Sequence, residues 1–210
     1  MSNGQDASAV IAPAPRHARG PGDPAPEYVL EPGADLVGAD LAGRNLANVD
    51  LTGADLSNAD LSGARLINAT LRDASLFRAN LARTHLLGAD LSGADLTEAR
   101  AGGAILGSAC LDRATLFNVD LSGATLTDAS LRGADLRSAQ LCGVRLRGAD
   151  LSDAELRAAE LTDADLSGAG VSGADFGDAS LVGSRLRNVT GFTEAHWVGV
   201  DISNVDFTSA

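Results

Sequence analysis

A leucine recurs at every fifth position from Leu36 to Leu186, and an alanine almost always stands two residues before it. Within this run only Ala101, Val171 and Phe176 replace the leucine. Five residues turn an α-helix by about 500°, so leucines at this spacing would wander round its surface. On a flat strand, an odd step would put successive leucines on opposite faces. The period therefore predicts a chain that turns once per repeat and points every leucine into one core.

The residue two before each leucine is predicted to point inward as well, near a corner of a narrow coil, and must be small. Alanine fills most of these positions, and the exceptions are Arg44, Val49, Thr84, Val119, Val144 and Ser184. Glycine recurs two residues after the leucine, as at Gly38, Gly63 and Gly93. Turns at these positions tolerate unusual backbone angles in glycine.

The repeated unit reads Ala-Asp-Leu-Ser-Gly, letter for letter, at 59–63, 89–93 and 164–168. It resembles the pentapeptide-repeat family, whose repeat is small residue, Asp or Asn, Leu or Phe, polar residue, Gly. The resemblance covers 33–210 and implies an all-β fold, a right-handed quadrilateral β-helix with about twenty residues per coil. Coils stacked about 4.8 Å apart would give a solenoid on the order of 40 Å long.

The chain is predicted to have a tail, a short cap and one solenoid. All six prolines lie in the first 32 residues, and the Pro/Ala/Gly-rich stretch 1–27 is predicted to be disordered. Residues 28–32 are either an N-terminal cap over the first coil or the end of the tail. Residues 33–210 form the β-helix, with one extra residue near 190–191. After that register slip, the five-residue step continues through Phe192, Trp197, Ile202 and Phe207.

The composition bears on the compartment and on the kind of partner. No basic start followed by an apolar run opens the chain, so no signal peptide is predicted and a cytoplasmic protein is expected. Cys110 and Cys142 fall at different places in the repeat, which predicts free thiols. The net charge is −12 and the basic residues are all arginine. Such a chain is expected to avoid nucleic acid and anionic membranes and to attract basic protein surfaces, although solubility alone would also explain the charge.

If four repeats make one coil, the outward residues that precede each core leucine stack twenty residues apart. The first face, through Leu36, carries Asp35, Asp55, Ser75, Asp95, Thr115, Asp135, Glu155 and Asp175. The second face, through Leu41, carries Asp40, Asp60, Asn80, Arg100, Asp120, Gln140, Glu160 and Ser180. Like charges stacked about 5 Å apart repel, so the acidic first face is a candidate partner-binding site. The alternative is that aspartate is favoured there because it bonds to the turn backbone.

The other two faces are less acidic. The third face, through Leu46, is neutral to basic, and four arginines gather near one end: Arg145, Arg147, Arg185 and Arg187. The fourth face, through Leu51, mixes Asp50, Thr70, Asp90, Cys110, Ser130, Asp150 and Gly170.

Two pairs of apolar residues outside the core are candidate contact patches. Phe77 and Phe117 follow core leucines on the first face and are predicted to be exposed. Ile67 and Leu87 are neighbours in the corresponding position of the third face. The alternative is that they are isolated surface residues without a role.

Two irregularities interrupt the repeat. Ala101 replaces a core leucine and is followed by two glycines, which predicts a small void, kink or bulge, since truncating a buried leucine to alanine costs about 2–5 kcal/mol. At the other irregularity, the C-terminal end, an uncapped coil exposes unpaired backbone groups. Relatives in the family often form dimers there, which implies a C-terminal homodimer through Phe192, Trp197 and Phe207.

The sequence offers no constellation for catalysis. His17, His85 and His196 are scattered, and no His/Cys spacing typical of a metal site occurs. The serines and aspartates occupy repeat positions without a base to activate them, and no lysine is present for a phosphate loop. A non-catalytic protein without cofactor or metal is predicted.

The family resemblance implies a specific function. Its best understood members are acidic DNA mimics that bind DNA gyrase or topoisomerase IV and modulate it or protect it from inhibitors such as quinolones. Here the phosphates would be represented by Asp35, Asp55, Asp95, Asp135, Glu155 and Asp175, with Phe77 and Phe117 beside them. The leucine core and the lack of long loops differ from the plasmid-borne members and are nearer to the loop-free mycobacterial type. The alternative is a rigid protein-interaction scaffold with an unknown partner.

Overall fold

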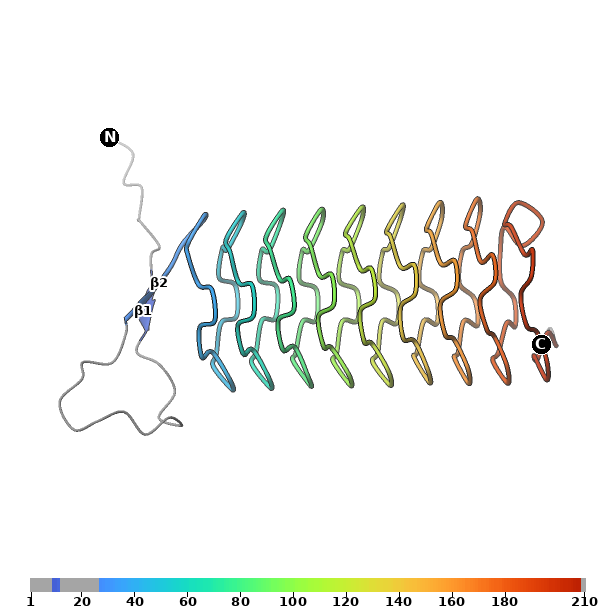
Figure 1. The fold of residues 1–210 in the computed structure, drawn as a ribbon, viewed down its shortest axis with the longest axis horizontal. Helices are drawn as coiled ribbons and strands as arrows, with labels where there is room; N and C mark the ends of the chain where they lie inside the picture. The colour runs from blue at the N-terminus through green and yellow to red at the C-terminus, as the bar shows by residue number, and fades with distance from the viewer. Residues whose placement is uncertain (1–8, 12–26, 209–210) are drawn as a thin grey trace.

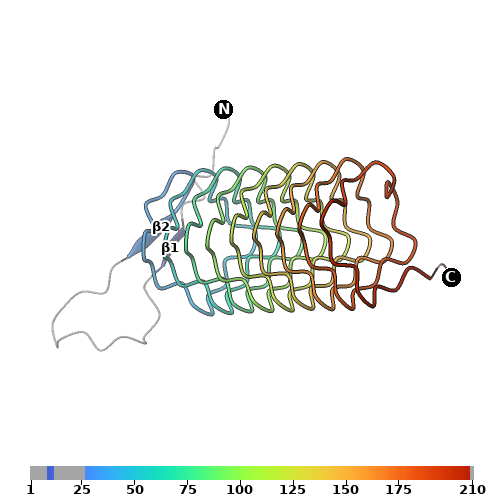
Figure 2. The same ribbon diagram turned by 45° about the vertical axis from the view of Figure 1, so that its right-hand side comes forward.

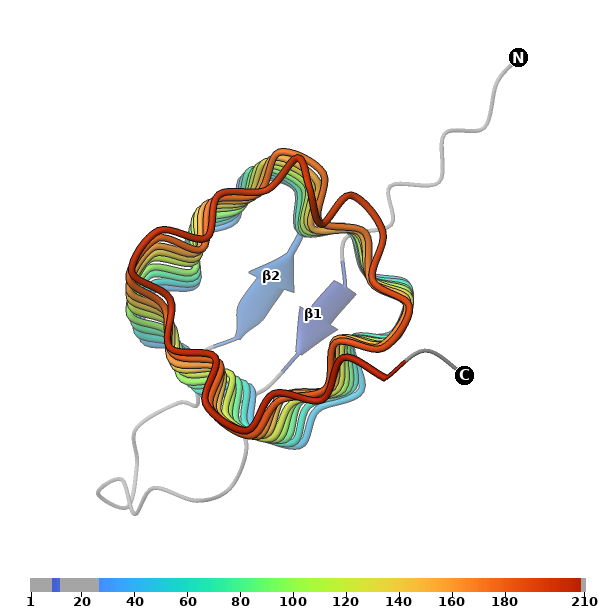
Figure 3. The same cartoon turned by 90° about the vertical axis from the view of Figure 1, so that its right-hand side faces the viewer.

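The computed structural model describes residues 9–11 and 27–208, and the second range winds into a β-helical solenoid (Figure 1). Viewed along its axis, the coils superimpose as a four-sided tube (Figure 3). The outward residues pair in parallel bridges twenty residues apart, such as Asp35 with Asp55 and Asp40 with Asp60. The described ranges contain no helix. The predicted all-β coil, built from four five-residue repeats, is therefore the observed one.

Every side of the tube ends in the same kind of turn. The Ala39 N–H donates to the Leu36 carbonyl at 3.0 Å, and this bond recurs from repeat to repeat. Between these two residues, Gly38 has a left-handed backbone conformation with φ of 66°. Every fifth residue from Gly33 to Asn188 likewise has positive φ. A turn with positive φ only at its third residue is type II, which explains the glycines predicted at this position.

Backbone hydrogen bonds hold each coil to both neighbours. In the second coil, the Asp55 N–H donates to the Ala34 carbonyl of the first coil at 2.9 Å, and the Leu56 N–H donates to the Ser75 carbonyl of the third at 2.7 Å. From Leu36 to Leu186, the leucine and the small residue of nearly every repeat point inward and are almost wholly buried, while Arg44 and Val49 are half-buried. The core is thus a continuous column of stacked leucines and alanines along the axis.

The N-terminal end of the tube is covered by two short strands (Figures 2 and 3). β1 (Ala9–Ile11) pairs antiparallel with β2 (Tyr28–Leu30). Leu30 is buried against the core, and the Tyr28 hydroxyl accepts a hydrogen bond from the Asp40 N–H at 3.1 Å. In the next coil the equivalent N–H of Asp60 bonds to the preceding coil. β2 therefore substitutes for a missing coil.

The prediction that 1–27 is disordered is wrong for Ala9–Ile11, which forms β1 by pairing with β2. Residues 1–8 and 12–26 lie outside the described residues. The composition of the tail could not reveal this strand, because its partner is supplied by the edge of β2 rather than by a repeat.

The kink or bulge predicted at Ala101 is also wrong. Arg100 bridges Asn80 on one side and Asp120 on the other, so the ladder passes through this coil without a break. The Ala101 N–H donates to the Asp120 carbonyl at 2.6 Å, and Ala101 is buried. The hydrogen bonds of the two neighbouring coils fix the backbone whatever side chain stands at this position.

The ladder shifts by one residue near the C-terminal end. Gly170 bridges Thr190, twenty residues on, whereas Asp175 bridges His196, twenty-one residues on. The extra residue therefore lies between Thr190 and His196, in the wider loop seen at the end of the solenoid in Figure 1. This loop carries Phe192, and it allows the larger side chains of the last coil to close the tube.

Candidate functional site

The aspartates of the first face have a structural role in the turns. Asp35, Asp55 and Asp95 each accept a hydrogen bond through Oδ1 from the backbone N–H two residues on, at 3.3, 3.0 and 2.9 Å. Hydrogen bonds from Ser57 hold the pKa of the Asp55 carboxyl below its usual range. The same contact is made on every face, for example by Asp165 to Ser167. The interpretation that aspartate bonds to the turn backbone is confirmed, and within the described ranges the Oδ2 atoms of Asp35, Asp55 and Asp95 make no hydrogen bond or ion pair.

Arginines partly neutralise the C-terminal half of the acidic column. Arg137 lies 2.7 Å from an oxygen of Asp135 and 3.3 Å from one of Glu155. Hydrogen bonds from Arg137 lower the pKa of Asp135. Arg157 likewise lies 3.5 Å from Asp175. These three acidic residues of the predicted site therefore share two arginines, which reduce their negative charge without cancelling it.

The acidic residues of the N-terminal half are different. Among the described residues, no arginine lies within ion-pair distance of Asp35, Asp55 or Asp95. The same is true of Asp40 and Asp60 on the second face, which bridge each other across one coil spacing. Asp120 and Glu160, farther along the second face, also lie beyond ion-pair distance of any described arginine, so the unpaired carboxylates of the two columns are more numerous toward the N-terminal end without being confined to it.

The two aromatic residues of the first face lie under arginines. Phe77 is half-buried and has the Arg78 guanidinium 4.8 Å from its ring centroid. Phe117 is 40% exposed, with the Arg137 guanidinium 5.9 Å from its centroid. Cation–π contacts of this kind cover part of each ring. The two rings belong to coils two apart, with Thr97 between them in the stack, so they do not form one patch.

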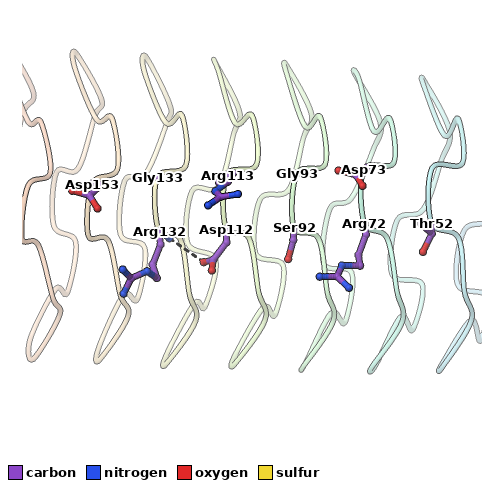
Figure 4. A pocket seen from close by; sticks show the side chains of 10 residues that line it. All are labelled: Thr52, Arg72, Asp73, Ser92, Gly93, Asp112, Arg113, Arg132, Gly133 and Asp153. Atoms are coloured by element: carbon purple, nitrogen blue, oxygen red, sulfur yellow. Dashed lines mark hydrogen bonds between the residues drawn. The ribbon is translucent and has the colours of Figure 1, made fainter.

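The fourth face carries a groove of about 800 Å³ (Figure 4). It is lined by Thr52, Arg72, Asp73, Ser92, Gly93, Asp112, Arg113, Arg132, Gly133 and Asp153. Arg72 pairs with Asp90 at 3.1 Å, and Arg132 pairs with Asp150 at 3.0 Å. Because basic and acidic residues alternate along it, the groove offers a polar surface without an excess of either charge.

The third face carries an exposed apolar patch next to its arginines. Ile67 is half-buried, Leu87 is 48% exposed and Ile105 is 40% exposed. Leu87 leans over Gly107, where a Cβ would meet its Cδ1 at 3.2 Å. The sequence indicated Ile67 and Leu87 as neighbours but did not join Ile105 to them. The sequence signal for Ile105 is that an apolar residue stands directly before core Leu106, where the other repeats carry mostly polar residues. In the structure Ile105 bridges His85, which lies in the same coil as Leu87.

The C-terminal end brings together all three residues predicted for dimerisation. Trp197 stacks between Phe176 and Phe192, with centroids 4.4 and 4.5 Å away, and Phe192 meets Phe207 edge to face at 5.9 Å. The Trp197 Nε1–H donates to the Phe192 carbonyl at 2.8 Å. A cavity of about 150 Å³ opens among them, lined by Leu186, Phe192, Trp197, Val200, Ile202 and Phe207.

An ion pair fixes the last repeat of this end. The Nε and Nη2 atoms of Arg187 donate to Asp206 at 2.8 and 2.6 Å. Arg187, together with hydrogen bonds from Thr208, lowers the pKa of Asp206 to about 2. A carboxyl whose pKa is lower in the folded state contributes stability above its ordinary pKa, and that contribution is lost as the pH falls.

We therefore expect Arg187→Gln to destabilise the protein at neutral pH and to have a diminishing effect between about pH 4 and about pH 2. Urea unfolding of both proteins across this range measures the difference. A difference that stays constant down to the lowest pH would contradict the assignment of this ion pair.

Within the described ranges, no group of three or more His, Cys, Asp or Glu side chains is placed to hold a metal ion. No helix in that part of the chain could cross a lipid bilayer. The features that stand out on the solenoid are therefore surfaces: an acidic N-terminal half, a basic and apolar third face, and an aromatic end.

Comparison with known proteins agrees with the geometry. The family described as pentapeptide repeats matches residues 34–73, 74–112, 109–148 and 134–169, in eight copies. The chain belongs to the pentapeptide-repeat family. No curated protein matches this pentapeptide-repeat protein in sequence.

Several solved structures are similar to it. Full-length QnrB1, a plasmid-mediated fluoroquinolone resistance protein, is 22% identical over 85% of this chain and 91% of its own, with a TM-score of 0.73. HetL, a pentapeptide-repeat protein involved in heterocyst differentiation regulation in the cyanobacterium Nostoc sp. strain PCC 7120, is 32% identical over 78% of this chain and 87% of its own, with a TM-score of 0.47. The likeness to QnrB1 shows a shared β-helical fold.

Proposed function

We propose that this pentapeptide-repeat protein is a non-catalytic DNA mimic that binds a type II topoisomerase, DNA gyrase or topoisomerase IV. It would modulate the enzyme or protect it from inhibitors such as quinolones. The observation that carries the proposal is a set of carboxylates on two adjacent faces of the N-terminal half that have no ion pair within the described ranges, namely Asp35, Asp55, Asp95, Asp40 and Asp60. Because such enzymes act on DNA in the cytoplasm, the proposal places the protein there.

The mechanism follows from spacing and rigidity. Carboxylates on successive coils lie about 4.8 Å apart on a backbone that cannot rearrange, because each coil bonds to both neighbours. A fixed array of negative charge attracts the arginines and lysines of a DNA-binding surface without first having to be ordered. The neutralised half, with Asp135, Glu155 and Asp175, would add less to binding because its charges are already paired.

The decisive experiment removes the charge and keeps the fold. Asn45 and Asn80 already make the turn contact of aspartate, to the N–H groups of Ala47 and Ala82 at 3.4 and 3.2 Å. The triple variant Asp35→Asn, Asp55→Asn, Asp95→Asn should therefore fold normally. The matched control changes three aspartates of the fourth face that have no ion pair among the described residues: Asp50→Asn, Asp73→Asn, Asp153→Asn.

We expect the wild-type protein to inhibit gyrase supercoiling, or to reduce quinolone-induced cleavage, in a manner that weakens with salt. The first-face triple variant should require about tenfold more protein for the same effect, and the fourth-face control should match the wild type. Absence of any effect on both gyrase and topoisomerase IV would reject the proposal. Equal losses in the two triple variants would show that only the total charge matters.

A second candidate function, a rigid protein-interaction scaffold, is favoured by the apolar patch of the third face, since a DNA mimic has no need of exposed Leu87 and Ile105. A homodimer through the aromatic C-terminal end is compatible with both functions, because that end lies far from the acidic half along the solenoid.

A further inference from the structure

The third face differs from the rest of an acidic protein in both charge and polarity. Its outward positions carry more arginine than aspartate: Arg65, Arg145, Arg147, Arg185 and Arg187 against Asp128, Asp165 and Asp206. Its N-terminal half carries the exposed side chains of Leu87 and Ile105, with Ile67 beside them. The surface therefore has an N-terminal end where Arg65 lies beside the apolar residues, and a C-terminal end where the other four arginines gather.

One apolar position and two basic positions of this face are spaced two coils apart. The ladder through this face places Ile105 two bridges from Arg145, and Arg145 two bridges from Arg185. With coils about 4.8 Å apart, these positions lie about 9.6 Å from one another along the axis. In the neighbouring outward column, Gly107 lies beside Ile105, Arg147 beside Arg145 and Arg187 beside Arg185. We call the coil at Ile105 the apolar step and the coils at Arg145 and Arg185 the basic steps. Each basic step carries two arginines.

The apolar step is an exposed surface formed by Leu87 and Ile105. Gly107 is buried, and the Leu87 side chain of the preceding coil covers it, with its Cδ1 at 3.2 Å from where a Cβ of residue 107 would stand. Ile105 belongs to the same repeat as Gly107. An apolar side chain lying here would contact both Leu87 and Ile105 and would remove part of their exposed surface from water.

The basic steps keep charge for a ligand. Arg147 and Arg185 lie on either side of Asp165, and Arg145 bonds only weakly to the Thr125 hydroxyl at 3.4 Å. Burial raises the pKa of Asp165, but hydrogen bonds from Ser167 and the charges of both arginines offset this and lower it overall. Two aspartates, Asp128 and Asp165, thus lie among three arginines, while Arg187 is held by Asp206.

An extended peptide in the polyproline II conformation has a matching repeat. Such a segment has three residues per turn and rises about 3.1 Å per residue, so every third side chain points the same way at intervals of about 9.3 Å. That interval is close to the two-coil spacing of about 9.6 Å. A β-strand would instead bring side chains to one side about every 6.6 Å, which falls between the steps.

We propose that the third face is a docking surface for an acidic segment of a protein partner in polyproline II conformation. An apolar side chain of the segment lies on Leu87 and Ile105, and acidic residues three and six positions away meet the arginines of the next two steps. The inference does not rest on the proposed topoisomerase binding, which uses the first and second faces. Nucleic acid is disfavoured because its phosphates would leave the apolar step uncovered and would meet the acidic residues of the other faces.

The test uses fluorescently labelled peptides of one composition. Leu-Pro-Pro-Glu-Pro-Pro-Glu and its reverse sequence place the two glutamates three and six residues from the leucine, whereas the control Leu-Glu-Pro-Pro-Glu-Pro-Pro places them one and four residues away. We expect one of the two in-register peptides to bind at least about tenfold more tightly than the control in low salt. Equal affinity of all three peptides, or tighter binding of a DNA duplex, would overturn the proposal.

Variants of the full chain identify the surface. Leu87→Ser with Ile105→Thr, and separately Arg145→Gln with Arg185→Gln, should each abolish the preference for the in-register peptide; Thr125 and Gln140 show that such residues fit these slots. Arg72→Gln on the fourth face should leave it unchanged. Self-association that these substitutions abolish would instead assign the surface to a second copy of the chain and overturn the proposal. None of the variants should alter gyrase supercoiling, which separates the two tests.

Discussion

Truncation of Leu121 to Ala is expected to lower the free energy of unfolding by about 2–5 kcal/mol, toward the upper end of that range. Leu121 is buried and stacks directly on Ala101, the position where the second face already lacks a leucine. A second truncation would place two alanines on successive coils. Because the ladder hydrogen bonds hold the coils at fixed spacing, the surrounding backbone has little freedom to collapse into the space.

Urea unfolding followed by circular dichroism measures this effect, with Leu161→Ala as the matched control, since Leu161 stacks between Leu141 and Leu181. The converse change, Ala101→Leu, should raise stability, because the unbroken backbone keeps the register of a leucine position. If Leu121→Ala lowers the free energy of unfolding by less than Leu161→Ala does, the coil at Ala101 has already closed around its smaller side chain.

Replacing Trp197 by Ala is expected to produce the second large effect, a loss of about 3 kcal/mol. The indole joins the last coil to the core through Phe176 and to the wide loop through Phe192. Without it, the last coil keeps ladder bonds on one side only, and its amides should exchange with solvent much faster than those of the central coils. Hydrogen exchange monitored by mass spectrometry resolves the two regions.

The same variant tests the proposed C-terminal homodimer. Trp197→Phe retains a stacking ring and serves as the control, so a dimer through this end should survive in Trp197→Phe and dissociate in Trp197→Ala. Sedimentation at several concentrations provides the measurement. A wild-type protein that stays monomeric at every concentration would reject the dimer and would leave the expected loss of stability untouched.

The regular part of the solenoid could be predicted from the sequence because each repeat contains the residues that determine its own conformation. The leucine specifies a core position, the small residue before it a corner, and the glycine or asparagine after it a turn. The neighbouring repeats contain the same three residue types. Even the one-residue shift is visible in the spacing of the last aromatic residues, and the ladder moves accordingly between Thr190 and His196.

The candidate site was predictable only in outline. Stacking residues twenty apart correctly placed the acidic residues in one column, but it did not reveal that Arg137 would reach across a coil from Asp135 to Glu155. A long side chain can lie along either direction of the column, and its choice depends on the charges of both neighbouring coils. The division of the first face into a free acidic half and a neutralised half is a result of these contacts.

The sequence by itself determined the period, the core and the order of the faces, because these depend on side chains within a single repeat and on their identical neighbours. The tertiary structure alone decided the straight backbone at Ala101, the pairing of β1 with β2, the joining of Ile105 to Leu87 and the aromatic stack on Trp197. Each of these depends on hydrogen bonds or contacts supplied by an adjacent coil or chain end. Such contacts join residues that are far apart in the sequence, and their energies outweigh the local preference of the single residue.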